Sequence, residues 1–301
     1  MPELRVATFN CENLFARYKF GSTLDPATVS ENGFTIDKTA FTILKEDEKA
    51  VTAKAILAAK ADVVAVQEVE NLEVLRRFNS ERLKSAGYKH TMLIDGPDPR
   101  HIDVGLLSRY PIVHVRSYQS LREGNSAVFS RDCLEADIDV DGSRLTLFIN
   151  HFKSMLGGRK QTRPKRLKQA KAVRQIVTDR FGANAGDAPW IVLGDLNDFP
   201  EDAEGTTTAL TELTAWDQLE NVIERLDEAE RFTHFQDTTK ELSQLDYVLL
   251  SKSLAAATAA KPVLIRKGLS TKAAVDGPRF PEVTAKIVAS DHCPFAIDIK
   301  L

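Results

Sequence analysis

The chain lacks the features that mark several specialised classes of protein. Its three cysteines, Cys11, Cys133 and Cys293, are an odd number without metal-site spacing. They indicate small buried side chains in a reducing compartment rather than a disulfide framework. The sequence also has no membrane-length apolar run and no signal-peptide core. We therefore expect a cytoplasmic protein without a membrane segment, the alternative being a signal peptide that was removed.

Positive charge is not in excess either. The 40 lysines and arginines are outnumbered by 43 aspartates and glutamates, which leaves a formal net charge of −3. Attraction to nucleic acid or to an anionic membrane must therefore be local. A content of 43% hydrophobic and 28% charged residues is typical of a soluble globular protein. No change in composition divides the chain, so we interpret residues 1–301 as one domain, expected to be a monomer.

The most informative stretch runs from Trp190 to Pro200. An apolar run of strand length, 190–193, is followed at once by Asp195, Asn197 and Asp198. Because side chains alternate along a strand, Asp195 and Asn197 can face the same side. The alternative is a plain strand followed by an Asx-type turn, which Asp and Asn favour. The rest of the chain has to decide between the two interpretations.

Strand and helix patterns alternate along the whole chain. Asp141-Gly142 between two strand patterns predicts a hairpin, and residues 19–38 read as a polar surface insertion. The mixture favours an α/β sandwich with mixed sheets over a regular βαβ repeat. The predicted strands are 4–9, 62–68, 103–108, 133–140, 145–150, 190–193, 244–251 and 295–299, and the predicted helices are 46–60, 72–86, 164–181 and 210–229.

Polar residues recur where these strands end, which suggests one rim where strand ends converge. Several carboxylates and an amide without a cysteine ligand suit a hard cation such as Mg²⁺ or Mn²⁺. Two histidines beside such a cation suit phosphoryl transfer. As imidazolium groups they can donate hydrogen bonds to the phosphate oxygens, where negative charge develops during the reaction. The recurring residues are Asn10, Glu12, Glu68, His151, Asp195, Asn197, Asp246, Asp291 and His292.

Six short motifs in this order resemble the endonuclease/exonuclease/phosphatase superfamily, and a bacterial subgroup of predicted nucleases within it. They are Thr8-Phe-Asn10-x-Glu12-x-Leu14, Val66-Gln-Glu68, Asn150-His151-Phe-Lys-Ser154, Gly194-Asp195-x-Asn197, Leu245-Asp246-Tyr247 and Ser290-Asp291-His292. The resemblance implies a DNase I-like four-layer sandwich, in which two mixed sheets pack face to face between helices. It also implies Mg²⁺-dependent attack of water on a phosphate ester.

The resemblance further assigns a role to each residue of the rim. Glu68 is similar to the main metal ligand, with Asn10 and Asp291 near the ion and Glu12 at an acidic position close to it. Asp195 resembles the residue that activates water, and Asn197 resembles the amide that holds the scissile phosphate.

The histidines have counterparts in the family as well. His292 is similar to the histidine that polarises the phosphate, and Asp246 to the carboxylate that orients it. His151 stands where DNase I-like and sphingomyelinase-like members have a second histidine and abasic-site nucleases have a tyrosine, which disfavours an abasic-site enzyme. Arg100 and Lys153 are the candidates for further phosphate contacts.

One stretch, 159–174, has eight basic residues and no acidic residue. It is either a solvated helix face or a phosphate-binding lip beside the His151 motif. In the segment that precedes Asp246, Phe232 and Phe235 could stack on a base or sugar, but core packing is the preferred interpretation. The isolated His90, His101 and His114 are interpreted as ordinary surface histidines.

Together these features predict a divalent-metal phosphodiesterase, first of all a nuclease acting on DNA or RNA or another small phosphodiester. The alternatives are a phosphomonoesterase or a lipid- or inositol-type phosphoesterase of the same superfamily, and an inactive member used for binding. No apolar membrane-binding loop is evident, which disfavours the lipid version.

Overall fold

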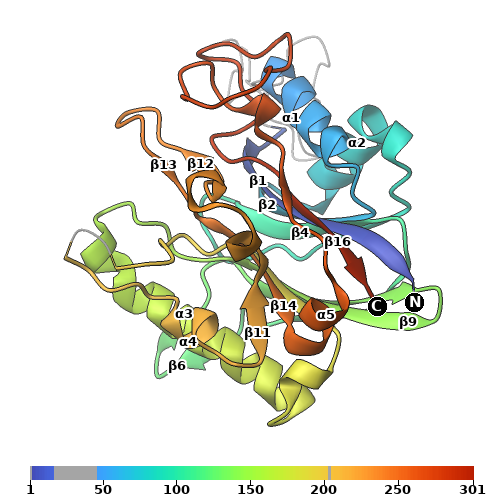
Figure 1. The fold of residues 1–301 in the computed structure, drawn as a ribbon, viewed down its shortest axis with the longest axis vertical. Coiled ribbons are helices and arrows are strands. Elements are labelled where there is room, and N and C mark those ends of the chain that lie inside the picture. Colours follow the sequence, from blue (N-terminus) through green and yellow to red (C-terminus); the bar gives the residue numbers. More distant parts are fainter. Residues whose placement is uncertain (1, 17–45, 203–204) are drawn as a thin grey trace, which may run out of the picture.

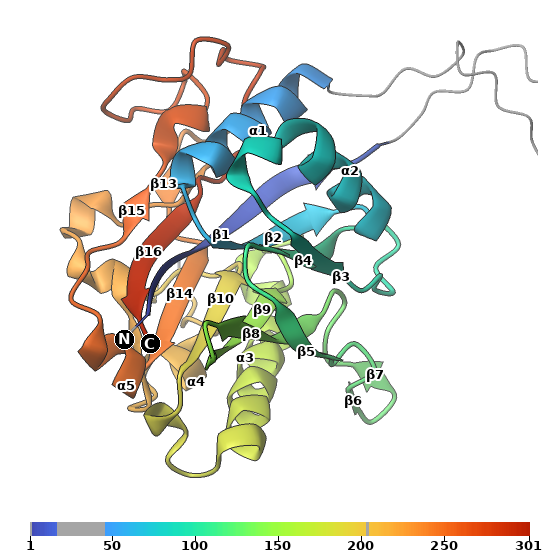
Figure 2. The same ribbon diagram turned by 90° about the vertical axis from the view of Figure 1, so that its right-hand side faces the viewer.

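The structure is a computed structural model that describes residues 2–16, 46–202 and 205–301. Its centre consists of two six-stranded mixed sheets packed face to face (Figures 1 and 2). Helices cover the outer face of each sheet, so the predicted four-layer sandwich is confirmed. The predicted insertion at 19–38 lies outside the described residues.

The first sheet contains the N-terminal strand and the C-terminal strand as neighbours. Its β1 and β2 are parallel, whereas β16 and β4 run antiparallel to them. Its strands in spatial order are β15 (Val263–Leu264), β16 (Phe295–Lys300), β1 (Glu3–Leu14), β2 (Val63–Val69), β4 (Asp103–Ser108) and β3 (His90–Leu93).

The second sheet is built around another parallel pair, β9 and β10. The predicted Asp141-Gly142 hairpin is confirmed as the turn between β8 and β9, with Asp141 and Gly142 both at positive φ. The strands in spatial order are β11 (Leu219–Asn221), β14 (Asp246–Ser251), β10 (Trp190–Asp195), β9 (Ser143–His151), β8 (Cys133–Val140) and β5 (Ile112–Ser117).

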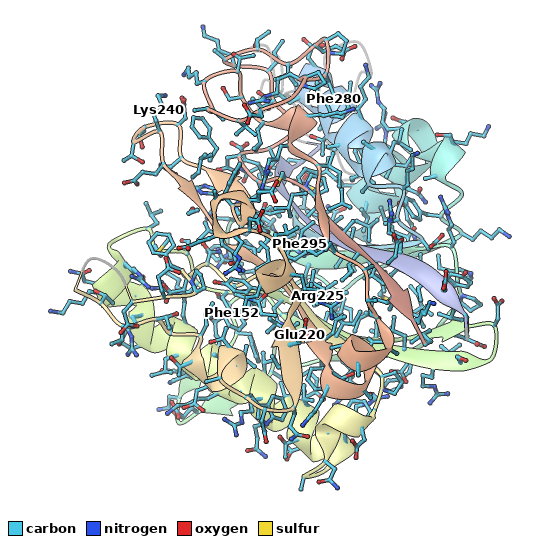
Figure 3. All side chains as sticks on the ribbon, viewed as in Figure 1. Phe152, Glu220, Arg225, Lys240, Phe280 and Phe295 are labelled. Atoms are coloured by element: carbon cyan, nitrogen blue, oxygen red, sulfur yellow. The ribbon has the colours of Figure 1, made fainter. Side chains whose placement is uncertain are left out.

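Apolar side chains fill all three spaces between the four layers. Alternate residues of both sheets, such as Val6, Leu147 and Val248, form the central core. Helices α1 (Glu46–Ala59) and α2 (Leu72–Arg82) cover the first sheet, while α3 (Arg159–Phe181) and the short α4 (Thr211–Thr214) cover the second (Figure 2). The small helix α5 (Lys252–Ala257) follows β14. Phe295, at the centre of Figure 3, is fully buried.

The predicted helix at 210–229 is wrong over most of its length. Only Thr211–Thr214 is α-helical, and the chain then forms β11 and two short 3₁₀ turns. Residues Leu219–Asn221 pair with the edge of β14, so the exposed strand edge outweighs the local preference for helix. Helix α3 also begins before its predicted start at Pro164, which lies within the helix.

Two small hairpins complete the fold and were not predicted. One pairs β6 (Arg122–Glu123) with β7 (Ser126–Ala127). The other pairs β12 (His234–Phe235) with β13 (Leu242–Ser243), and Lys240 lies in its turn at the periphery of the molecule (Figure 3). Within the described ranges, no helix is long and apolar enough to span a membrane.

Candidate active site

The strand ends that carry the predicted residues meet at one end of the two sheets. Asn10 is in register with Gln67 of β2, one residue before Glu68. In the second sheet, Asp195 is opposite His151 on one side and Asp246 on the other. The parallel strands end here and the antiparallel strands begin here, so residues far apart in sequence reach one rim.

A cavity of about 1240 Å³ opens at this rim. Lys153 is not among the residues that line it, and its Nζ donates to the carbonyl oxygen of Ser154 at 3.2 Å. Asp246 is fully buried and lies behind His292. The predicted residues that line the cavity are Asn10, Glu12, Glu68, Arg100, His151, Asp195, Asn197, Asp291 and His292.

Asp195 is the centre of the hydrogen-bond network. Its Oδ2 accepts from Asn10 Nδ2 at 3.0 Å and from Asn197 Nδ2 at 2.9 Å, and its Oδ1 accepts from the Asn197 amide at 2.9 Å. The Nε2 atoms of His151 and His292 lie 3.6 and 3.9 Å from Oδ2. Burial raises the pKa of Asp195 to about 7, although the positive charge of His292 opposes the rise. A carboxylate with such a pKa is suited to accept a proton near neutral pH.

His292 is oriented by a buried carboxylate. Its Nδ1 lies 2.8 Å from Asp246 Oδ2. Burial alone would lower the pKa of His292, but the negative charges of Asp246 and Asp195 outweigh it, and the pKa is raised well above its usual value. His292 is therefore a cationic hydrogen-bond donor at neutral pH.

His151 differs from His292 although both rings are buried. Its Nε2 faces the carboxylates of Asp195 and, at 3.8 Å, Glu68. Burial, together with the positive charge of Arg131, lowers the pKa of His151 well below its usual value. The lowered pKa favours the neutral form of His151, which differs from the expectation of two imidazolium groups.

Glu68 and Asp291 are the carboxylates that would hold a divalent cation. Burial and the negative charge of Asp291 raise the pKa of Glu68. Burial opposes the ionisation of Asp291, but His234 and His292 hold its pKa at about 2. Two facing carboxylates beside the Asn10 amide fit a hard cation, which would relieve their repulsion. Glu12 supports this group, because its Oε2 accepts from the Asp291 amide at 3.0 Å.

The backbone is strained where these residues sit. Glu12, Asn13, Glu68 and Asn197 all have positive φ, between 45° and 66°. Such conformations are unfavourable for non-glycine residues and concentrate at functional sites. The backbone is also crowded at Gly194, where a Cβ atom would lie 2.0 Å from the Asn150 carbonyl oxygen. The strained backbone at the ends of β1, β2 and β10 therefore indicates a functional site.

Two residues of the site were not predicted from the sequence. His234 on β12 lines the cavity, with its ring centroid 4.8 Å from that of His292. Arg131 precedes β8; it is buried, lines the cavity, and has Nε 3.1 Å from Asp98 Oδ2. Its charge acts on Glu68 and Asp195. In the sequence, His234 lies between Phe232 and Phe235 and belongs to none of the six motifs, and Arg131 has no motif around it.

The basic stretch 159–174 is not simply a solvated face, and one of its residues, Arg159, also lines the cavity. Arg159 and Arg166 are buried and bind the two carboxylate oxygens of Asp198 at 2.7 and 3.0 Å. Arg174 lies 3.4 Å from Glu212 Oε2, and Lys168 pairs with Glu123. Most of these basic residues therefore form contacts that hold α3 against the rest of the protein.

Phe235 packs in the core as preferred, whereas Phe232 both packs against the core and lines the cavity. Phe235 is buried beside Leu269 and Cys293, and Phe232 packs against the same cluster. The cysteines are free and buried. Burial raises the pKa of Cys293 to about 12, so a thiolate nucleophile is not available at the rim.

Comparison with known proteins agrees with this geometry. A family model described as "Endonuclease/Exonuclease/phosphatase family" matches residues 5–269. The chain therefore belongs to the endonuclease/exonuclease/phosphatase family, and it is a phosphoesterase of that family. Members of the family typically use a divalent metal ion. No curated protein matches the chain.

Solved structures share the fold at low sequence identity. An endonuclease/exonuclease/phosphatase from Bacteroides vulgatus matches with a TM-score of 0.62 and 15% identity, covering 100% of both chains. The human Nocturnin catalytic domain with bound sulfate gives 0.62 and 17%, covering 99% of this chain and 94% of that one. A mannosyl-6-phosphatase from Bacteroides thetaiotaomicron gives 0.61 and 16%, covering 99% and 100%.

Proposed function

We propose that this protein is a divalent-metal-dependent phosphodiesterase, and that a nuclease is the first form of it to test. The observation that carries the proposal is the buried Asp195 carboxylate, which faces Asn10, Asn197 and two imidazoles at the rim of one cavity. We further propose Mg²⁺ or Mn²⁺ as the ion, because the donors are mainly oxygen atoms.

Each side chain has one step in the proposed hydrolysis. Asp195 orients a water molecule and accepts its proton, for which its pKa of about 7 is suited. His292, held by Asp246, donates a hydrogen bond to an oxygen of the scissile phosphate. Asn197 fixes Asp195 from the side that faces the cavity.

The cation would be held by Glu68 and Asp291, with Asn10 and Glu12 beside them. When bound, such an ion neutralises charge on the phosphate and on the departing oxygen. His151 is neutral and lies between Glu68 and Asp195, so it can donate from Nε2 without adding a charge. Arg131 and Arg100 supply positive charge at the wall of the cavity.

A second candidate function is hydrolysis of a small sugar-like phosphoester. The cavity is also lined by Glu201, Glu224, Glu228 and Glu241, together with Arg159 and Arg231. It also contains the buried Asn221, whose Nδ2 donates to Glu224 at 3.3 Å and whose Oδ1 has no partner among the described residues. A wall of hydrogen-bond acceptors suits hydroxyl groups better than a second phosphate. The fold similarity to a mannosyl-6-phosphatase supports testing this class.

One assay distinguishes these functions. Wild-type protein and an Asp195→Asn variant, prepared identically, are incubated with Mg²⁺ or Mn²⁺ and with plasmid DNA, single-stranded oligonucleotide, RNA, bis-p-nitrophenyl phosphate and a sugar 6-phosphate. Preferred cleavage of a nucleic acid supports the nuclease. Preferred release of phosphate from the sugar phosphate supports the second candidate. Absence of metal-dependent turnover on every substrate rejects the phosphodiesterase proposal and favours a binding module. Turnover that the Asp195→Asn variant retains in full rejects the role of Asp195.

A further inference from the structure

Two imidazoles and one carboxylate face a common position at the edge of the cavity. His234 Nε2 lies 3.6 Å from Asp291 Oδ2, and His292 Nε2 lies 3.8 Å from Asp291 Oδ1. One ligand atom from each of the three residues can be chosen so that all lie within 4.8 Å of one another. His234 and His292 are almost fully buried, whereas the Asp291 side chain is partly exposed. The position is therefore reachable from solvent but built on rigid groups.

The two imidazoles are oriented in the same way. His292 Nδ1 is engaged by Asp246 Oδ2 at 2.8 Å, and His234 Nδ1 is engaged by the Ser243 hydroxyl at 3.2 Å. Both rings are therefore held through Nδ1, which leaves each Nε2 directed at Asp291. Histidines that bind metals in proteins are typically held in this manner, by a second group on the other ring nitrogen.

We propose that His234, Asp291 and His292 form a binding site for a transition-metal ion of the zinc class, which overlaps the proposed Mg²⁺ or Mn²⁺ group at Asp291. Two imidazole nitrogens and one carboxylate, with a water as the fourth ligand, are a donor set that suits Zn²⁺ far better than Mg²⁺. Ligand bonds of about 2.0–2.1 Å in a tetrahedron place ligand atoms roughly 3.3–3.5 Å apart. The two distances from Asp291 involve different carboxylate oxygens, and one ligand atom from each residue gives a group within 4.8 Å. The three side chains must therefore move closer together around the ion to reach that geometry.

The backbone holds the two halves of this site together. His234 and His292 form an isolated antiparallel β-bridge. The Phe235 amide donates to the Asp291 carbonyl at 2.8 Å, and the Cys293 amide donates to the Thr233 carbonyl at 2.8 Å. The β12–β13 hairpin is thereby bonded on both sides of His234 to the segment 291–293. A site with this support loses little conformational entropy when an ion binds.

Occupation of the site should inhibit the enzyme, an inference that rests on the proposed function. The site shares Asp291 with the proposed Mg²⁺ group and uses His292 Nε2, the atom proposed to donate to the phosphate. Binding of the ion displaces the Nε2 proton of His292 to solvent, while Nδ1 keeps its proton for the hydrogen bond to Asp246. Zn²⁺ at this position takes both groups out of the hydrolytic reaction. The third ligand, His234, would thus make hydrolysis sensitive to the concentration of free zinc.

The site can be tested without turnover by using Co²⁺ as a coloured probe. Metal-free wild-type protein is titrated with Co²⁺ in the absence of Mg²⁺, because Mg²⁺ would compete for the shared Asp291. We expect one equivalent of Co²⁺ to give the intense visible absorption of a four-coordinate ion. His234→Gln should weaken this binding about tenfold or more. The control, His114→Gln, alters a half-exposed histidine on β5 and should leave the spectrum unchanged.

The outcome that overturns the proposal is equally specific. If His234→Gln and wild-type protein bind Co²⁺ with equal affinity and equal spectra, His234 is not a ligand. Ser243→Ala is the second variant, for the case in which His234→Gln misfolds. It leaves all three ligands in place and removes only the hydrogen-bond partner of His234 Nδ1. A smaller loss of Co²⁺ affinity in Ser243→Ala supports the site, and an unchanged affinity in both variants rejects it.

Inhibition by zinc is measured separately. Each variant is assayed at saturating Mg²⁺ with buffered free Zn²⁺, and its activity is expressed relative to its own zinc-free rate. Half-inhibition of His234→Gln should need about tenfold more Zn²⁺ than wild type or His114→Gln. Glu68→Gln separates the two proposals, since it should need more Mg²⁺ for turnover but keep the Co²⁺ spectrum. If wild type binds Co²⁺ as described but shows no turnover, only the proposed function fails.

Discussion

Asn10 and Asp195 join the two sheets at the rim, where Asn10 Nδ2 donates to Asp195 Oδ2 at 3.0 Å. Asn10 belongs to β1 of the first sheet and Asp195 to β10 of the second. Both side chains are buried. The contact therefore links the proposed metal group of one sheet to the proposed water-activating group of the other.

Replacing Asp195 by Asn should lower kcat without loss of stability. The change removes the proton acceptor, a group that typically contributes about 10²- to 10⁴-fold to the rate. Burial raises the pKa of Asp195 to about 7, so its ionised form opposes folding above that pH. The neutral variant should consequently unfold at an equal or higher temperature at pH 8. Steady-state kinetics and thermal unfolding are the measurements, with the exposed Asp217→Asn as the control. A kcat within threefold of wild type would remove Asp195 from its role.

The charge on His292 should depend on Asp246. In EDTA-treated protein, the side-chain NMR signals of His292 should titrate well above the usual histidine range, because Asp246 and Asp195 raise its pKa against the effect of burial. Asp246→Asn removes the larger of these charges and should lower the pKa of His292. Since the raised pKa stabilises the folded state below the pH at which His292 loses its proton, the variant should lose stability mainly at neutral and acidic pH. An unchanged titration of His292 in Asp246→Asn would contradict the assignment.

Removal of divalent ions should abolish turnover. EDTA should stop hydrolysis, and Mg²⁺ or Mn²⁺ should restore it, because Glu68 and Asp291 repel each other unless a cation lies between them. Glu68→Gln should raise the Mg²⁺ concentration needed for half-maximal rate by about tenfold or more. Activity titrations against free Mg²⁺ measure this. Full activity in EDTA would end the metal proposal.

The buried pair of Arg166 and Asp198 should matter for stability. Both side chains are fully buried, with Arg166 Nε 3.0 Å from Asp198 Oδ2. Arg166→Met leaves part of a buried carboxylate uncompensated, which typically costs about 3–5 kcal/mol. The exposed Lys160→Met on the same helix should change the free energy of unfolding by no more than about 0.5 kcal/mol. Urea unfolding of both variants tests the comparison, and equal effects would show that the basic stretch is not structural.

Salt should affect oligonucleotide cleavage only weakly, if an oligonucleotide is the substrate. Arg100 and Arg131 are the candidates for phosphate contacts at the cavity. Two such contacts on a single strand give a slope of roughly −1.4 in a plot of log kcat/KM against log salt. A slope steeper than about −3 would require the stretch 159–174 to bind the substrate after all.

Local sequence patterns determined much of the fold. The alternation around Asp141-Gly142 located the β8–β9 hairpin, and the apolar runs located β2, β4 and β10. Polar residues at strand ends indicated the rim, because the end of a strand and the identity of the residue there can both be read from the local sequence. The six motifs, taken in order, identified the family.

Contacts between distant segments were decided only by the tertiary structure. His234 reaches His292 because β12 bridges a segment 58 residues further along the chain. Arg166 is buried because Asp198 lies beneath it. Residues 219–221 became a strand because β14 offered an edge. In each case the partner across space, rather than the neighbour in sequence, set the free energy of the residue, and a one-dimensional pattern does not contain that partner.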